Sequence, residues 1–282
     1  MLKIPLVVLL DIDGTLIGDI TPQVIMYELK QRAKLSYNNK SLQEKLKSGI
    51  IRPNFKMFFN DLKEHGVEFF IYTSSEKKWA EHIVKQIEVT CDVKFNRPIF
   101  ARNYCHMVNG DYKKSISTVK GAIVKTLKKK YNNITANSLK NMIMAIDNNM
   151  VYEGNDKKNL LLCDTYNFQM PENLPLTINK NIFESKHNII MNIITAYFPR
   201  LKYTNNYMKF EKQFYTEYIS AINDTLKQRS QSSYDILFKS IRNFIIGKNI
   251  TSFNENILQY LNNKLHTFTN TTKNAGGTRS FF

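Results

Sequence analysis

Four short apolar runs separated by helical patterns are the feature that most constrains the fold of this chain. Each run is largely apolar and rich in β-branched or long aliphatic residues, which is typical of strands buried on both faces of a parallel sheet. Strands that alternate with helices in this way indicate an α/β fold, a doubly wound parallel sheet with helices on both faces. The runs cover residues 4–11, 67–72, 141–146 and 159–163, and the helical patterns between them cover residues 54–65, 76–89 and 117–131.

The strand pattern ends near residue 186, and this divides the chain. We expect an α/β domain over residues 1–185, in which residues 17–50 form an insertion after the first strand. Amphipathic patterns without strands follow and predict a helical appendage over residues 186–268. Residues 269–282 contain two adjacent glycines, and we expect a disordered tail there.

The charge balance favours an acidic partner. Lys and Arg total 40 against 24 Asp and Glu, which gives a formal net charge of +16. Nucleic acid, a phosphoprotein or a membrane surface would all suit such a balance. Residues 186–282 hold 13 Lys and Arg against 5 Asp and Glu, so this third of the chain carries +8, half of the net charge. The basic C-terminal region therefore predicts recruitment of a phosphorylated or nucleic-acid-associated target.

Cysteine content and hydropathy indicate a reducing, intracellular setting. The three cysteines are scattered and form no CxxC pair, so we expect neither a disulfide framework nor a zinc site. The apolar run near the N-terminus is too short for a membrane span and lacks a cleavage site, so we expect no membrane segment and a cytoplasmic or nuclear location. The abundance of Asn, Lys and Ile is typical of an AT-rich genome, such as that of a large DNA virus or a protist.

The residues just past the strand ends carry the recognisable chemistry. Asp11-Ile-Asp13-Gly14-Thr15 follows the first run, Thr73-Ser74-Ser75 the second, and Asp147-Asn148-Asn149 the third. Ligands of open α/β sheets bind beyond the carboxyl ends of the strands, so we expect the three clusters to form one site. A carboxylate at such an exit can attack phosphorus and form an aspartyl-phosphate, while a second carboxyl two residues on donates and accepts the proton. A pair of aspartates two residues apart could also be no more than a solvated turn if it stood alone.

These segments resemble the haloacid dehalogenase superfamily of phosphohydrolases, whose signature is similar to Asp11-Ile-Asp13-Gly14-Thr15-Leu16. The resemblance narrows to the phosphatases that act on the C-terminal domain of RNA polymerase II, the NLI-interacting-factor-like branch. It extends over about residues 5–178, with the segments in the family order, and implies a Rossmann-like sheet. The segments that carry it are Arg52-Pro53, residues 68–75, Trp79-Ala80, residues 95–105, residues 110–115 and residues 145–149 with Asn159.

The resemblance implies a Mg²⁺-dependent phosphatase that acts on phosphoserine or phosphothreonine in a phosphoprotein, with the RNA polymerase tail as one candidate. Asp11 would be the nucleophile and a metal ligand. Asp13 would be the acid and base, with its backbone carbonyl facing the metal. Thr73 would hydrogen-bond a phosphoryl oxygen, and its alternative role is an N-cap for the following helix.

The remaining roles implied by the resemblance concern charge and the metal. Lys114 would neutralise the nucleophile and the phosphoryl group; its neighbour Lys113 is less favoured because the Gly-x-Tyr-x-Lys spacing selects Lys114. Asn148 would be a direct Mg²⁺ ligand, and Asp147 would complete the site by orienting it or by contacting Lys114. A site with few protein ligands is usual for Mg²⁺, which keeps several waters.

Ser74, Arg97 and Arg102 are further candidates for binding the substrate, and a solvated sheet edge is the alternative for the two arginines. The chain departs from the branch where Gly14 replaces an acidic residue and where no proline follows Asn149. These departures leave open a substrate other than the polymerase tail. Two alternative functions are kept beside the leading one. One is a nucleotide or polynucleotide-end phosphatase, which the basic charge favours. The other is a non-catalytic phosphoprotein-binding or scaffold module, which the presence of both aspartates disfavours.

Overall fold

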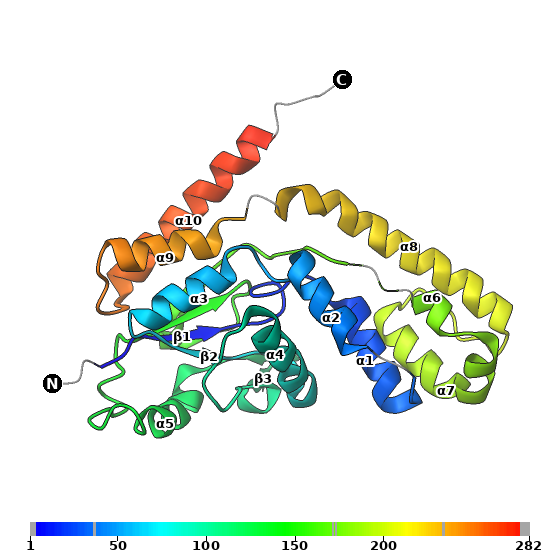
Figure 1. Cartoon of the computed structure of the whole chain (residues 1–282), viewed down its shortest axis with the longest axis horizontal. Helices are drawn as coiled ribbons and strands as arrows, with labels where there is room; N and C mark the ends of the chain where they lie inside the picture. The colour runs from blue at the N-terminus through cyan, green and yellow to red at the C-terminus, as the bar shows by residue number, and fades with distance from the viewer. Residues whose placement is uncertain (1–3, 36–37, 171, 173, 233–234, 277–282) are drawn as a thin grey trace. The chain divides into compact units, whose positions relative to one another are not determined.

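The computed structural model of the chain describes residues 4–35, 38–170, 172, 174–232 and 235–276 (Figure 1). The chain forms two compact units, each assembled from separate segments. The sheet unit contains Met1–Leu16, Arg52–Tyr166 and Asp235–Phe282. The helical unit contains Ile17–Ile51 and Asn167–Tyr234.

In the described part of the sheet unit, four parallel strands form a sheet in the order β2-β1-β5-β6. Val7 at the start of β1 pairs with Glu68 of β2 on one side and Ile143 of β5 on the other. Because β1 is flanked on both sides, the chain leaves β1 at the middle of the sheet. The strands are β1 (Val7–Leu10), β2 (Glu68–Ile71), β5 (Ile143–Asp147) and β6 (Leu160–Leu162).

Helices cover both faces of this sheet, which confirms the predicted α/β class. On one face, the buried side chains of α5 pack in one cluster with Val7, Leu9 and Phe70. On the other face, Phe69 of β2 lies 4.5 Å from Phe59 of α3, ring centroid to ring centroid. The helices of the sheet unit are α3 (Phe55–Glu64), α4 (Lys77–Cys91), α5 (Ile116–Leu127), α9 (Leu237–Gly247) and α10 (Glu255–Gly276).

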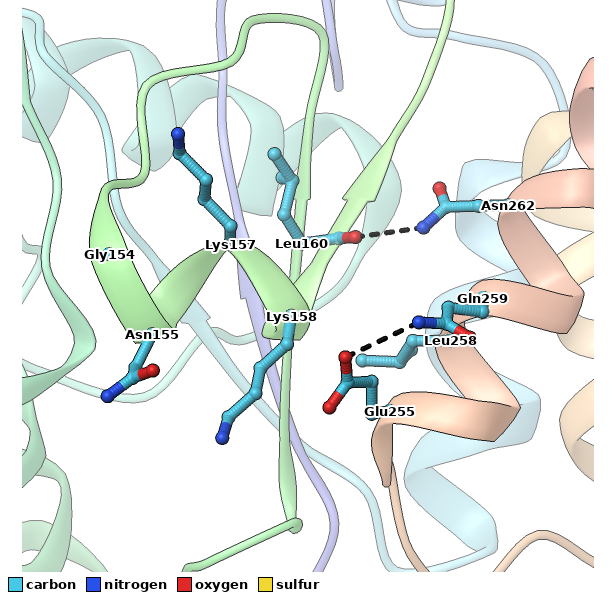
Figure 2. Close-up of a pocket in the computed structure, with 9 residues that line it drawn as sticks. All are labelled: Gly154, Asn155, Lys157, Lys158, Leu160, Glu255, Leu258, Gln259 and Asn262. Atoms are coloured by element: carbon cyan, nitrogen blue, oxygen red, sulfur yellow. Dashed lines mark hydrogen bonds between the residues drawn. The ribbon is translucent and has the colours of Figure 1, made fainter.

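The two C-terminal helices are part of the packing of the sheet unit. Phe238 of α9 lies 4.8 Å from Phe58 of α3, between ring centroids, and both rings are fully buried. The side chain of Asn262 on α10 donates to the carbonyl of Leu160 at 3.0 Å (Figure 2). It also accepts from the amide of Leu162 at 3.0 Å. Asn262 thereby satisfies backbone groups on the outer edge of β6, which no further strand of the described residues pairs.

A short hairpin precedes Lys114, which reaches the carboxyl ends of the strands. It joins β3 (His106–Val108) to β4 (Asp111–Lys113) in antiparallel pairing. Asn109 and Gly110 form the turn with φ of 51° and 85°, the positive values that a two-residue hairpin turn of this kind requires. The 3₁₀ helices η2 (Arg102–Tyr104) and η3 (Gly154–Asn159) complete the elements of this unit.

The first residue of β2, Glu68, is a buried acid. Glu68 is 2% exposed and accepts hydrogen bonds from Lys130 and Asn96, both at 2.8 Å. Lys63 also donates to this carboxylate, and the hydroxyl of Tyr131 donates at 2.9 Å. Burial acts to raise the pKa of Glu68, but the hydrogen bonds from the two lysines outweigh it and lower the pKa to about 2.

The helical unit has an aromatic and aliphatic core of its own. Ile25 and Leu29 of α1 pack with Phe183 and Ile190 of α7 in one buried cluster. Phe210 of α8 stacks on Phe183 with ring centroids 4.5 Å apart. The elements of this unit are α1 (Thr21–Ala33), α2 (Asn39–Lys45), η1 (Leu46–Ile50), α6 (Leu174–Thr177), α7 (Lys180–Tyr197) and α8 (Tyr207–Ser232).

These units group the chain differently from the expected domains. The expected insertion, residues 17–50, lies in the same unit as α7 and α8, whereas α9 and α10 lie with the sheet. Of the expected disordered tail, residues 269–276 continue α10, and residues 277–282 lie outside the described residues. Over the residues that the structure describes, no helix combines the length and the apolar character that a membrane span needs.

Candidate active site

The carboxyl ends of β1, β2 and β5 lie at one edge of the sheet and carry the three predicted polar clusters. Asp11 follows β1 directly, Thr73 is the second residue after β2, and Asp147 is the last residue of β5. Asp11, Thr73 and Asp147 are 6%, 1% and 1% exposed. The parallel strand order therefore gathers buried polar groups at the middle of the sheet, as the sequence predicts.

Lys114 joins two of these carboxylates. Its Nζ donates to Oδ1 of Asp11 and to Oδ2 of Asp147, both at 2.6 Å. The lysine is 1% exposed, so the three charges are held away from water. Burial acts to lower the pKa of Lys114, but the charges of Asp11 and Asp147 overcome it and raise the pKa above its usual value. Lys114 is therefore a fixed cation beside Asp11.

The backbone around the β3–β4 hairpin places Lys114 and not its neighbour. The amide of Lys114 donates to the carbonyl of Val151 at 2.9 Å, which ties the end of the hairpin to the segment after β5. The ammonium lies 5.6 Å from the centre of the buried Tyr72 ring. Lys113 points elsewhere and pairs with Asp111 at 3.8 Å. Of the two lysines, only Lys114 reaches the carboxylates.

Asp13 is held by a hydroxyl from the β2 end. Ser75 Oγ donates to Oδ2 of Asp13 at 2.6 Å. The amide of Ser75 in turn donates to Thr73 Oγ1 at 3.2 Å, so the loop after β2 is folded back on itself. The N-cap of α4 is Glu76, so Thr73 does not take the alternative capping role. Thr73 and Asp13 thus belong to one connected group.

Thr15 links the exits of β1 and β5. Its hydroxyl donates to Oδ1 of Asn148 at 3.1 Å and accepts from the Asn148 amide at 2.9 Å. Gly14 makes this approach feasible, because its φ is +75° and a Cβ there would lie 2.6 Å from Nδ2 of Asn148. Asn148 Nδ2 also donates to Thr165 Oγ1 at 3.1 Å. Position 14 therefore requires glycine for reasons of space and backbone conformation.

The donor set at this edge fits a hard divalent cation. The carboxylate of Asp11, the carbonyl of Asp13 and the amide oxygen of Asn148 are oxygen ligands, the type that Mg²⁺ prefers. Asp147 has both oxygens engaged, Oδ2 by Lys114 and Oδ1 by the amide of Asn149 at 2.8 Å. The bond between Asp147 Oδ2 and Lys114 suits the positioning of that lysine. Within the described ranges, no group of three or more His, Cys, Asp and Glu side chains is arranged to hold a metal.

The two predicted arginines lie in different places. The segment around residues 96–100 runs beside β2, since Asn96 donates to Phe69 and Phe100 donates to Ile71. Arg97 therefore lies alongside the body of β2, where both terminal nitrogens pair with Glu88 at 2.8 to 2.9 Å. Its guanidinium is already neutralised by that carboxylate.

Arg102 lies at the carboxyl end of β2. Its Nε donates to the carbonyl of Ser74 at 2.8 Å, and its guanidinium stacks over Tyr112 at 4.8 Å from the ring centre. It is also paired with the exposed Glu76 at 3.5 Å. Arg102 and Ser74 are therefore together, next to the Thr73–Ser75 loop, whereas Arg97 is not.

Three residues of this region were not among the sequence candidates for the site. Ser75 and Thr15 stand within the predicted clusters, and their hydroxyl groups could have marked them as site residues. Arg52 belongs to a segment that carries the family resemblance, which gives it no role in the site, yet it is 3% exposed and donates to the carbonyl of Thr15 at 3.2 Å.

A separate pocket of about 420 Å³ lies between η3, β6 and α10 (Figure 2). Its lining includes Lys157, Lys158 and Gln259 and none of the residues at the ends of β1, β2 and β5. The pocket is therefore separate from the candidate site.

The sequence matches a known protein family. The family described as NLI interacting factor-like phosphatase matches residues 6–188, which is more than half of the chain. This range includes every residue of the cluster at the strand ends. No curated protein matches the chain significantly.

Solved structures of phosphatases are similar to the chain at low identity. A fission yeast RNA polymerase II CTD phosphatase, Fcp1, bound to beryllium fluoride shares 17% identity at a TM-score of 0.43, over 98% of this chain and 67% of that one. Another structure of Fcp1 shares 16% identity at a TM-score of 0.33, over 81% and 65%. A phospho-aspartyl intermediate analogue of phosphoserine phosphatase shares 16% identity at a TM-score of 0.29, over 55% and 81%.

Proposed function

The chain belongs to the NLI interacting factor-like phosphatase family, and from this premise we propose that it is a Mg²⁺-dependent phosphatase that works through a phosphorylated Asp11. Its proposed substrates are phosphoserine and phosphothreonine in proteins. The observation that carries the proposal is the buried group in which Lys114 bridges Asp11 and Asp147, with Asp13 two residues from Asp11. A carboxylate held beside a fixed cation at a strand end is equipped to attack a phosphoryl group.

The reaction has two displacements at phosphorus. In the first, a carboxylate oxygen of Asp11 forms a bond to phosphorus while the bond from phosphorus to the substrate oxygen breaks, and Asp13 gives its proton to that leaving oxygen. In the second, water loses a proton to the Asp13 carboxylate and attacks phosphorus. The bond from Asp11 to phosphorus then breaks, which releases phosphate and restores both carboxyl groups.

Lys114 and Ser75 prepare the two carboxyl groups for these roles. Lys114 holds Oδ1 of Asp11, which directs Oδ2 of the same carboxylate to the phosphoryl group. The ammonium charge also offsets part of the repulsion between the nucleophile and the substrate. The Ser75 hydroxyl on Oδ2 of Asp13 fixes the orientation of the proton donor.

Asp11, the carbonyl of Asp13 and Asn148 would hold the Mg²⁺ ion. When bound, the ion supplies positive charge that offsets the repulsion between two anions and stabilises the charge that develops on the phosphoryl oxygens. Asp147 keeps Lys114 in place beside it.

One observation supports a protein substrate. Arg102, 40% exposed in its side chain, stands beside Ser74 at the site edge, where it can contact an acidic peptide. We assign the phosphoryl contact to Thr73 and the peptide contacts to Ser74 and Arg102, and we propose an intracellular setting for the reaction.

Turnover of an aryl phosphate tests the proposed chemistry. Wild type, Asp11→Asn and the matched pair Lys114→Gln and Lys113→Gln are assayed with and without Mg²⁺. We expect Mg²⁺-dependent turnover in wild type and Lys113→Gln, and its loss in Asp11→Asn and Lys114→Gln. Absence of turnover by the wild type with any divalent metal would refute the proposed enzymatic function and favour a binding module.

The net charge of +16 favours a second candidate, a nucleotide or polynucleotide-end phosphatase that uses the same site. Competition of phosphopeptides against nucleotides and 3′-phosphorylated DNA separates the two. Turnover of DNA ends that exceeds turnover of phosphopeptides by orders of magnitude would refute the proposal of a protein substrate. Salt-dependent DNA binding by the intact chain would support a role for the basic C-terminal region in recruitment.

A further inference from the structure

Arg52 is a buried arginine that holds two segments of the candidate site. It is 3% exposed, and its Nη1 donates to the carbonyl of Thr15 at 3.2 Å. Its Nη2 donates to the carbonyl of Asp164 at 3.0 Å. One guanidinium therefore joins the turn after β1 to the segment after β6.

The two segments joined by Arg52 both contact Asn148. Thr15 Oγ1 donates to Oδ1 of Asn148 at 3.1 Å and accepts from its amide at 2.9 Å. Thr165, adjacent to Asp164, accepts from Nδ2 of Asn148 at 3.1 Å. The side-chain amide of Asn148 is thus held by Thr15 on one side and Thr165 on the other. Arg52 binds the backbone carbonyls of Thr15 and of Asp164, the neighbour of Thr165.

Asp235 supplies the counter-charge of Arg52. Its Oδ2 accepts from Nε at 2.8 Å and lies 2.7 Å from Nη2. Its Oδ1 accepts from the amide of Leu237 at 3.1 Å, so the carboxylate is anchored at the start of α9. Asp235 lies outside residues 6–188, the range that matches the family. The counter-charge therefore comes from the part of the chain for which the family provides no role.

We propose that Asp235 is a positioning residue for the Mg²⁺ site, acting through Arg52, Thr15 and Asn148. This inference rests on the proposed function, because it takes Asn148 as a ligand of the ion. A buried guanidinium needs a partner for its charge. Without the carboxylate it would shift toward water or other acceptors and release Thr15 and Asp164. Residues that orient metal ligands in this way typically change metal affinity 10- to 100-fold when they are lost.

The chain offers a matched control for this ion pair. Arg242 of α9 pairs with Asp61 of α3, and the two side chains are 32% and 27% exposed. This pair also fastens α9 to the sheet unit, but it has no hydrogen bond to the segments around Asn148. Asp61→Asn therefore removes another ion pair of α9, a more exposed one, and leaves the chain of contacts from Arg52 to Asn148 intact.

The test measures Mg²⁺ affinity directly by titration calorimetry on the full chain, together with turnover of an aryl phosphate. We expect Asp235→Asn to weaken Mg²⁺ binding about 10-fold or more, with KM at saturating Mg²⁺ unchanged, and Asp61→Asn to bind Mg²⁺ as the wild type does. Asp235→Glu should recover part of the affinity. Thr15→Val should weaken binding as well, and the double variant Asp235→Asn with Thr15→Val should lose little more than either single one.

Wild-type Mg²⁺ affinity in a folded Asp235→Asn would overturn the inference, as would an equal loss in Asp61→Asn. If Asp235→Asn does not fold, Arg52→Lys makes the same test. The lysine keeps the charge pair but cannot reach Thr15 and Asp164 together, so the inference requires weaker Mg²⁺ binding. A wild type that turns over substrate with Mg²⁺ while these variants behave normally refutes only this inference. A wild type without turnover and without Mg²⁺ binding refutes the proposed function as well.

Discussion

Replacement of Lys114 by methionine should strongly destabilise the sheet unit. Lys114 is 1% exposed and donates to Asp11 and Asp147 at 2.6 Å each. Methionine keeps most of the volume but leaves two buried carboxylates facing each other without a cation. Loss of one partner from a buried ion pair costs about 3–5 kcal/mol, because the other charge remains buried and uncompensated. With two carboxylates left behind, we expect a loss at the upper end, about 4–5 kcal/mol in the free energy of unfolding.

Urea unfolding followed by tryptophan fluorescence measures this loss in the correct unit. Trp79 is the only tryptophan of the chain, lies on α4 of the sheet unit and is 7% exposed. Its signal therefore reports the unfolding of the sheet unit and not that of the helical unit. The shift in midpoint at constant slope gives the change in free energy.

Two further variants make the result specific. Lys113→Met removes the neighbouring lysine, whose partner Asp111 is exposed, and should change stability by less than about 1 kcal/mol. Lys114→Met combined with Asp147→Asn removes one charge of each sign, so it should be more stable than Lys114→Met alone. A loss of no more than about 1 kcal/mol in Lys114→Met, the value of an exposed ion pair, would refute the reasoning.

Three other predictions concern packing, acid stability and glycine. Glu68 has a pKa of about 2 in the folded protein, below its ordinary value of 4.5, so its contribution to stability is complete above pH 4.5 and is lost as the pH falls toward 2. Glu68→Gln should therefore lower the free energy of unfolding by about 2 kcal/mol at neutral pH, after allowance for the exposed lysine partner. In acid the difference between the variant and the wild type should vanish. Phe238→Ala should cost about 3–5 kcal/mol in the Trp79 transition, and an unchanged midpoint would mean that α9 does not pack on α3. Gly14→Ala should lower turnover at fixed Mg²⁺, because its Cβ would lie 2.6 Å from the Asn148 amide; normal turnover would contradict the geometry.

The site could be predicted from the sequence because its chemistry stands at the ends of strands that the sequence marks clearly. Asp11, Thr73 and Asp147 each follow a run whose composition dictates burial, and parallel strands end at one edge of the sheet. Lys114 follows no such strand. The family spacing indicated it, and its position depends on a hairpin that was not predicted, although Asn109-Gly110 is a strong turn signal.

The grouping of the helices could not be predicted, because amphipathic periodicity shows that a helix has a buried face and not which surface covers it. Residues 17–51 join residues 167–234 through buried contacts between distant segments. The pairing of Arg52 with Asp235 spans 183 positions, and no local pattern marks either residue as a partner of the other. The pairing of Arg97 with Glu88 could not be predicted from the sequence either, because nothing in the local pattern marks Glu88 as its partner.

Direct detection of a phosphorylated Asp11 tests the central claim. Asp13→Asn is mixed with an aryl phosphate and Mg²⁺, because an aryl leaving group needs little protonation and the missing base slows only the attack of water. After an acid quench, we expect peptide mass spectrometry to find one phosphoryl group on Asp11, which hydroxylamine removes. Phosphate release by the wild type without any phosphoryl group on Asp11 of the variant, or with the group on another residue, would contradict it.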